Sequence, residues 1–296
     1  MPGEGKALLA AALWAIAGIV FAAQIRRVSP LALNFIRCLA ATAFVCLLIP
    51  FTGASGEIRS ASAATIVTMV ATGVLSTAFG DSLFFFALPA LGASLAVPVS
   101  SSVYPLLTLF IAAVALGEKI TVTIVFGSLL VVLGIFLLLS QTRPAVVAAP
   151  VDERRRNAFD KRVAVLLLIA AAAFYTTSTV WLRVGTGNLG PTSAGVLRTG
   201  AAGVFLLSTL RPLEGSPRFD FRSAAWVAVA GVIGLGLGSL FYIAAVEEAG
   251  AGKTAVLTST MPLFNLPLAV LFLKERVTPR IILGTITCVA GISLII

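Results

Sequence analysis

The chain has 296 residues, of which 59% are hydrophobic and only 11% are charged, whereas soluble domains carry about 25% charged residues. This composition excludes an ordinary soluble protein and indicates that the lipid bilayer is the solvent. The net charge of +9 does not point to nucleic acid, because the lysines and arginines stand in gaps between apolar runs and form no basic face.

Ten apolar runs follow one another along the chain, each close to the length of about 17–25 residues that crosses a bilayer as a helix. Strands of a membrane barrel would instead alternate apolar and polar residues over about ten positions. We therefore predict an all-α membrane protein with ten transmembrane helices, at residues 7–24, 31–50, 63–87, 94–116, 121–140, 163–182, 191–210, 223–246, 251–273 and 279–296.

The second half of the sequence repeats the first. A shift of 157 residues places 82–139 on 239–296, with the same residue at 19 of 58 positions. The shared residues include prolines, glutamates and glycines, which are harder to match by chance than Leu, Val or Ala: Pro105 with Pro262, Glu118 with Glu275, Gly127 with Gly284 and Gly134 with Gly291. Further upstream the offset is about 161, and Arg37 aligns with Arg198.

Each repeat holds five predicted helices, and an odd number makes the second repeat enter the membrane upside down relative to the first. Inverted repeats of this kind are typical of secondary transporters. We predict one repeat at 1–140 and the other at 163–296, joined by a cytoplasmic basic linker at 141–162.

The positive charges predict an orientation. Assigning the gaps alternately to the two sides of the membrane puts fourteen Lys and Arg residues on one side and five on the other. The richer side is expected to be cytoplasmic. Both termini of this multi-pass protein are then predicted to be extracytoplasmic.

Two prolines lie at the middles of predicted helices 4 and 9. Pro105 and Pro262 each free a backbone carbonyl one turn earlier, so we predict a helix kink at both. Broken helices at matching midplane positions indicate a transporter's binding site. The substrate-binding candidates are the neighbouring polar side chains, namely Ser100, Ser101, Ser102, Tyr104, Thr258, Ser259 and Asn265. The alternative is that these hydroxyls satisfy the freed backbone groups or help helices to pack.

Aromatic residues flank these positions. Trp14 and Tyr242 lie well inside their predicted helices and are the preferred cavity-lining candidates. Phe84, Phe85 and Tyr175 are further candidates, whereas Trp181 lies near a helix end, where an interfacial anchor is expected.

Charged residues inside a membrane are costly and therefore informative. Arg37 and Arg198 occupy matching positions, which favours a structural role. Asp81 has no acidic counterpart, since a shift of 157 pairs it with Gly238. It is the candidate for proton or cation coupling, although an acid there also serves simply to pair with an arginine.

Glu118 and Glu275 end predicted helices 4 and 9, where the helix dipole disfavours a carboxylate. We expect structural roles for both, either in hydrogen bonds to the start of the following helix or in pairs with the adjacent Lys119 and Arg276.

The sequence lacks the residues that several classes of protein require. The chain has no histidine, and its three cysteines lie inside apolar runs, so we predict neither a metal site nor a disulfide framework. There is no phosphate-binding loop of the GxxxxGK[ST] kind, so ATP is not the direct energy source. We expect no cofactor, and no enzyme.

The order of these features resembles the EamA-like branch of the drug/metabolite transporter superfamily over essentially the whole chain. The resemblance rests on two five-helix units, Trp14 in helix 1, Arg37 in helix 2, and "GEKIT" and "KERVT" before the last helix of each unit. The resemblance implies a small-molecule carrier of the inner or plasma membrane. The sequence departs from the family pattern at Asp81, where a small or aromatic residue is expected.

From this sequence we predict a secondary transporter that exports or exchanges a small polar metabolite, such as an amino acid, by alternating access. Its partners are a small-molecule substrate, the lipid bilayer and a coupling proton or cation. The alternatives are a broad-specificity drug efflux carrier and an exchanger of sugar phosphates or nucleotide sugars.

Overall fold

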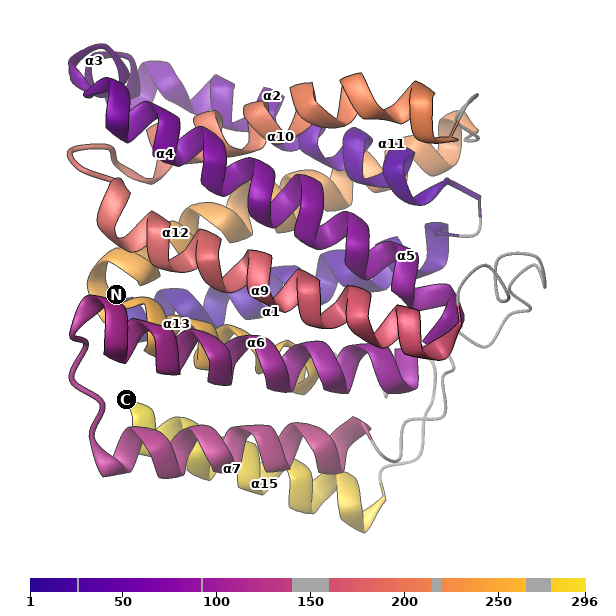
Figure 1. The fold of residues 1–296 in the computed structure, drawn as a ribbon, viewed down its shortest axis with the longest axis vertical. Helices are drawn as coiled ribbons and strands as arrows, with labels where there is room; N and C mark the ends of the chain where they lie inside the picture. The colour runs from indigo at the N-terminus through magenta and orange to yellow at the C-terminus, as the bar shows by residue number, and fades with distance from the viewer. Residues whose placement is uncertain (26, 92, 140–159, 215–219, 265–277) are drawn as a thin grey trace.

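The computed structural model describes residues 1–25, 27–91, 93–139, 160–214, 220–264 and 278–296, and every element longer than a turn in these ranges is helical (Figure 1). The first half contains α1 (Gly3–Gln24), α2 (Pro30–Thr52), α3 (Ala54–Ser60), α4 (Ala63–Gly73), η1 (Val74–Gly80), α5 (Asp81–Leu91), α6 (Ala93–Leu116) and α7 (Val122–Leu139). The second half contains α9 (Lys161–Gly185), α10 (Pro191–Glu214), α11 (Phe221–Gly231), η2 (Val232–Gly238), α12 (Ser239–Ala249), α13 (Ala251–Thr258) and α15 (Pro279–Ile295).

Seven stretches of the described helices are long and apolar enough to cross a membrane: Gly3–Phe21, Pro30–Thr52, Ala63–Leu88, Val99–Leu116, Lys161–Gly185, Pro191–Leu210 and Phe221–Ala249. Two shorter apolar helices, Val122–Leu138 and Pro279–Ile295, correspond to the predicted helices 5 and 10. The predicted span 251–273 lies partly outside the described residues, as does the linker 141–162. The protein is therefore an all-α membrane protein, and the count of ten spans stays a prediction.

The outward faces of the helices are strongly apolar. Phe51 is 84% exposed, Phe221 is 89% exposed and Val204 is 71% exposed, although each belongs to a long apolar helix. Side chains of this size and number on a helix surface are the expected lipid-facing groups of a membrane protein.

Polar residues at the helix ends satisfy backbone groups that the helices leave unpaired. Ser62 accepts from the N–H of Thr65 at the start of α4, and Asp220 accepts from the N–H of Ser223 at the start of α11. This N–H, together with the Ser223 hydroxyl, holds the pKa of the Asp220 carboxyl below its usual value. The cap is thus present above the usual pKa of an aspartate and is lost as the pH falls through the lowered value.

Two transmembrane stretches, residues 63–91 and 221–249, each contain a π-helical segment that was not predicted from the sequence. We call these two stretches the π-containing helices. η1 joins α4 to α5, and η2 joins α11 to α12. Both segments have seven residues, and both are followed by helices of 11 residues. A π-helix leaves some backbone carbonyls poorly paired and is often found at functional sites.

The bounds of the two π-containing helices correct the alignment of the two halves by one residue. These bounds match at an offset of 158, so that Asp81 corresponds to Ser239 and Gly80 corresponds to Gly238. The offset of 157 holds again at the proline pair, because the one-residue difference falls between the start of α6 and Pro105. Asp81 still has no acidic counterpart.

Close helix contacts come in exchanged pairs, as expected when a two-fold relation links two halves. A Cβ atom at Gly127 would lie 2.7 Å from the carbonyl oxygen of Gly291, and one at Gly134 would lie 2.7 Å from that of Gly284. Because Gly127 matches Gly284 and Gly134 matches Gly291, each contact is the image of the other. These contacts, which join α7 to α15, support the inverted-repeat interpretation.

Two helix crossings in the interior are related in the same way. Gly73 of α4 lies against the backbone of Arg198 on α10, and Gly231 of α11 lies against the backbone of Arg37 on α2. Gly73 matches Gly231 and Arg37 matches Arg198, so each glycine contacts the arginine of the other half. Close backbone contacts therefore hold one π-containing helix against α10, at Gly73, and the other against α2, at Gly231.

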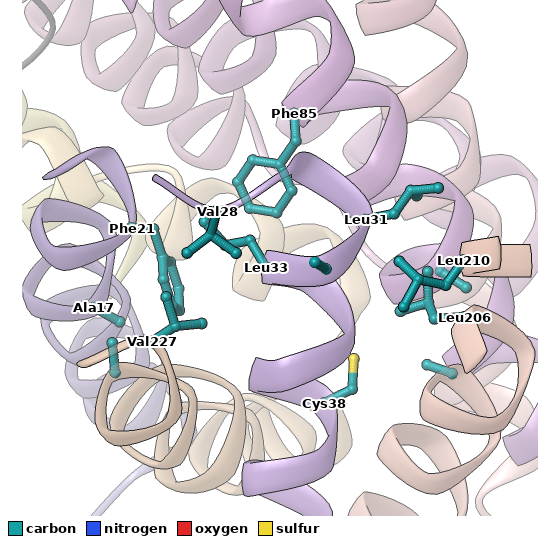
Figure 2. Packing of buried hydrophobic residues seen from close by; sticks show 14 residues of the cluster. Ala17, Phe21, Val28, Leu31, Leu33, Cys38, Phe85, Leu206, Leu210 and Val227 are labelled. Carbon is teal, nitrogen blue, oxygen red and sulfur yellow. The ribbon is translucent and has the colours of Figure 1, made fainter. Parts of the chain in front are cut away.

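The largest apolar cluster joins α1, α2, α5, α10 and α11. Figure 2 shows Phe85 lying over the connection between α1 and α2, near Val28 and Leu33, with Phe21 and Val227 on one side. Leu206 and Leu210 face α2 from the other side. This cluster fixes the packing of α2, the helix that carries Arg37.

Both termini lie at the same end of the molecule (Figure 1). The turn between α6 and α7 and the segment between α9 and α10 also lie at this end, whereas α9, α11 and α15 begin at the opposite end. α1 and α9 thus run in opposite directions. Which end faces the cytoplasm stays a prediction.

Candidate substrate site

Three hydroxyl groups meet in the interior of the helical bundle. Tyr104 of α6 lies 3.2 Å from Tyr242 of α12 and 3.2 Å from Thr179 of α9, measured between hydroxyl oxygens. The Tyr242 and Thr179 oxygens are 2.6 Å apart. All three side chains are buried or half-buried, and they come from both halves of the chain.

Aromatic rings surround these hydroxyls. The ring centroids of Trp14 and Tyr242 are 5.3 Å apart, and those of Tyr104 and Tyr175 are 5.8 Å apart. The indole N–H of Trp14 donates to the carbonyl of Gly234 in η2, at 3.0 Å. The structure thus brings together three predicted binding residues, Trp14, Tyr104 and Tyr242.

A second pair of hydroxyls extends the polar region along α6 and α9. Thr108 lies 2.9 Å from Thr176, and its hydroxyl also donates to the carbonyl of Tyr104. Sequence reasoning missed Thr176 and Thr179. The run "YTTST" at 175–179, five hydroxyl-bearing residues inside an apolar helix, was the available signal.

Asp81 lies at the junction of η1 and α5 and forms an ion pair with Arg37. The Tyr175 hydroxyl donates to the other carboxylate oxygen, at 2.7 Å. Asp81 therefore accepts from an arginine and a tyrosine, on α2 and α9. This pairing is the alternative to ion coupling that the sequence left open, and the pair is compatible with both roles.

Arg37 has further partners besides Asp81. Its Nε donates to Asn34 at 2.8 Å, and its guanidinium carbon lies 5.4 Å and 5.1 Å from the ring centroids of Phe21 and Phe85. Asn34, which sequence reasoning missed, donates in turn to the carbonyl of Thr77 in η1, at 2.7 Å. The polar groups around Arg37 thus form a connected network in the first half, which Tyr175 of α9 joins from the second half through Asp81.

Arg198 occupies the matching position but has different surroundings. Its Nη2 donates to the hydroxyls of Ser76 and Ser178 at 3.3 Å and 3.4 Å, which are long hydrogen bonds. Its Nη1 is buried without a hydrogen-bond partner within the described part of the chain. The two arginines occupy matching positions, as predicted, but their hydrogen-bonding and ion-pair partners differ.

The hydroxyls before the two prolines differ in their surroundings. Ser100, Ser101 and Ser102 are half-buried on α6, which continues through Pro105 without interruption. Thr258 and Ser259 are buried, and their hydroxyls donate to carbonyls of their own helix. These two donors already satisfy backbone groups, so their role toward a substrate stays a prediction.

The helix before Pro262 is interrupted: α13 ends at Thr258, a turn covers Ser259 and Thr260, and helical backbone resumes at Met261. The matching stretches are thus broken in one half and continuous in the other. The predicted site residue Asn265 and the predicted structural residue Glu275 lie outside the described residues.

Glu118 caps a helix, but not the helix expected from the sequence. Its two carboxylate oxygens accept from the N–H groups of Ala251 and Gly252, at 2.7 Å and 3.0 Å. These amides start α13 in the other half, where the helix dipole favours a negative charge. The expectation of a bond to the following helix, α7, was wrong, because the chain turns at Gly117, with φ +65°, and directs Glu118 toward α13.

Replacing Glu118 by Ala is expected to lower the free energy of unfolding by about 2 kcal/mol, because two N–H groups at a helix start lose a charged acceptor. Thermal unfolding of the purified protein in detergent measures the loss. Hydrogen exchange at Ala251 and Gly252 should also become faster. The exposed neighbour Lys119 supplies the control, and equal melting temperatures for Glu118→Ala and Lys119→Ala would contradict the cap.

Further charged contacts tie α1 to the second half at the same end of the molecule. Lys6 forms an ion pair with Glu248 of α12, and Glu4 lies 3.4 Å from Lys253 of α13. A pocket beside these pairs is lined by Glu118, Lys119, Arg183, Glu248 and Lys253, among other residues. The polar network of Tyr104 and Tyr242 lies deeper, among the transmembrane helices.

Comparisons with known proteins agree with this architecture. A family model described as "EamA-like transporter family" matches residues 1–140 and 162–296. A protein of Archaeoglobus fulgidus described as an uncharacterized transporter is 25% identical over 293 residues, which are 98% of this chain and 96% of that protein. A crystal structure with 14% sequence identity superposes with a TM-score of 0.77, over 99% of this chain and 95% of the other, and so shares its fold.

Proposed function

The chain belongs to the EamA-like transporter family, and on this premise we propose that it is a secondary carrier that exports or exchanges a small, amino-acid-like metabolite by alternating access. Membership makes it a membrane transporter and not an enzyme. The substrate, the direction of transport and the coupling are the proposed part.

The observation that carries the proposal is the hydroxyl cluster of Tyr104, Thr179 and Tyr242. Polar side chains inside a membrane protein are costly and commonly mark a transport pathway. The cluster is shared between the halves, at the kind of repeat interface where secondary transporters bind their substrates. If the halves move apart at one end, the cluster becomes accessible from that side.

The proposal includes ten transmembrane helices in two inverted repeats, 1–140 and 163–296, with 141–162 as a cytoplasmic linker. The excess of positive charge at the end where α9, α11 and α15 begin supports a cytoplasmic location for that end. Both termini are then extracytoplasmic. Asp81 is proposed to couple transport to a proton or cation.

Broad-specificity drug efflux is the second candidate, and the specific observation in its favour is the set of rings around the hydroxyl cluster. Trp14, Tyr104, Tyr175 and Tyr242 present flat apolar faces that accept varied ligands. Exchange of a sugar phosphate or a nucleotide sugar is the third candidate.

Transport into proteoliposomes tests the proposal. Vesicles loaded with a panel of unlabelled amino acids, drug cations or sugar phosphates should accumulate the labelled form of one class by exchange. We expect exchange with amino acids, and Tyr242→Phe should weaken it by about tenfold, because a hydroxyl of the cluster is lost. Failure of every solute to exchange, with or without a pH gradient, would refute the carrier function.

A further inference from the structure

We propose that Arg198 binds a carboxylate of the transported substrate, so that the substrate class is a small molecule with a single negatively charged carboxylate. This inference rests on the proposed carrier function and goes beyond it by assigning one residue and one functional group. Its starting point is the difference between the two matching arginines.

Arg198 is as deeply buried as Arg37, with 8% of its surface exposed in each case, yet only Arg37 has an acidic partner. No carboxylate lies within ion-pairing distance of Arg198 in the part of the chain that the structure describes. The position that corresponds to Asp81 in the second half is Ser239, which is uncharged. One half thus supplies its own anion and the other does not.

An arginine keeps its charge in a protein interior, so a buried guanidinium without a counter-ion is costly. The two serine contacts of Nη2 are long, and Nη1 has no partner among the described residues. The fork of N–H groups on a guanidinium matches a carboxylate, which accepts two parallel hydrogen bonds. A substrate carboxylate would therefore satisfy both the charge and the free donor.

Arg198 also adjoins the hydroxyl cluster. Its partner Ser178 is next to Thr179, whose hydroxyl lies against Tyr242. A molecule that reaches from Arg198 along α9 would meet the hydroxyls of Thr179 and Tyr242 and then the Trp14 ring.

The charge balance favours a carboxylate over a phosphate. The ion pair of Arg37 with Asp81 is neutral, which leaves the single positive charge of Arg198 in this region of the described residues. A carboxylate brings one negative charge, whereas a phosphate monoester brings about two at neutral pH. Since Nη1 is enclosed in this conformation, the substrate reaches it only when the two halves part.

The test compares amino acids with their carboxamides, which keep the shape but lose the negative charge. Wild-type protein in proteoliposomes exchanges labelled amino acids, and unlabelled L-leucine, L-serine and their amides compete. We expect each acid to compete at least about tenfold better than its amide. Arg198→Gln should raise the half-saturating concentration of the best amino acid by about tenfold or more, and Arg198→Lys should raise it less.

Arg59→Gln, at an exposed arginine of α3, serves as the control and should leave exchange unchanged. Equal competition by acids and amides, an Arg198→Gln protein with unaltered half-saturation, or preferential exchange of sugar phosphates would overturn the inference while leaving a carrier in place. If Arg198→Gln does not fold, the comparison of acids with amides on wild-type protein decides. Absence of all exchange would overturn the carrier function itself, and the inference with it.

Discussion

Replacing Asp81 by Ala is expected to lower the free energy of unfolding by about 3–5 kcal/mol, because it leaves the buried guanidinium of Arg37 without its counter-ion. Arg37 keeps its charge, and its remaining neighbours are Asn34 and two phenylalanine rings, which do not neutralise it. The Tyr175 hydroxyl loses its acceptor as well. Thermal unfolding in detergent measures the change.

Two variants distinguish the loss of this ion pair from a nonspecific loss of stability. Removing Arg37 together with Asp81, as Arg37→Met with Asp81→Ala, should recover part of the loss, because no unpaired charge remains. Glu4→Ala removes an acid from the ion pair at the end of the molecule and should cost less than about 1 kcal/mol. An Asp81→Ala protein as stable as Glu4→Ala would show that the buried pair contributes nothing.

The same residue tests the proposed coupling. A proton on Asp81 would remove the negative charge that holds Arg37, and Asn imitates the protonated acid. The Asp81→Asn protein should therefore still exchange substrate across the vesicle membrane, but an imposed pH gradient should not change the exchange rate. A response equal to that of the wild-type protein would reject Asp81 as the coupling residue and leave it as the counter-ion of Arg37.

Much of the fold followed from the sequence because the bilayer imposes it. The length of an apolar run and the position of charges between runs are set by membrane thickness, so seven long spans and two shorter apolar helices coincide with predicted ones. The clustering of Trp14, Tyr104 and Tyr242 also followed, since polar and aromatic groups inside such helices must face protein.

Features that depend on three-dimensional partners could not be predicted. The π-helical segments η1 and η2 have the composition of ordinary apolar helix, and only packing selects their geometry. Arg37 and Arg198 look equivalent in the sequence, but their partners come from other helices and differ. Glu118 binds the start of α13, more than 130 residues away, which no local pattern indicates.

The second large effect is expected at the crossing of α4 and α10. Gly73→Ala should lower the free energy of unfolding by about 3 kcal/mol, because its new Cβ would lie 2.2 Å from the carbonyl oxygen of Arg198 and 2.5 Å from its Cα. Backbone atoms in two packed helices do not yield as a flexible side chain does. The helices would have to separate, and Arg198 would move with α10.

Gly18→Ala is the matched control, since Gly18 lies in the interior of α1 and has nothing within 4 Å of an added Cβ. Alanine is intrinsically better than glycine in a helix by about 1 kcal/mol, so this variant should be as stable as the wild type or more so. The two substitutions are chemically identical, yet only Gly73→Ala should lower the melting temperature. Gly231→Ala, which would place a Cβ 2.7 Å from the Cα of Arg37, should behave like Gly73→Ala, because it tests the exchanged crossing in the other half. Stability of both variants equal to that of Gly18→Ala would contradict close crossings at the two arginines.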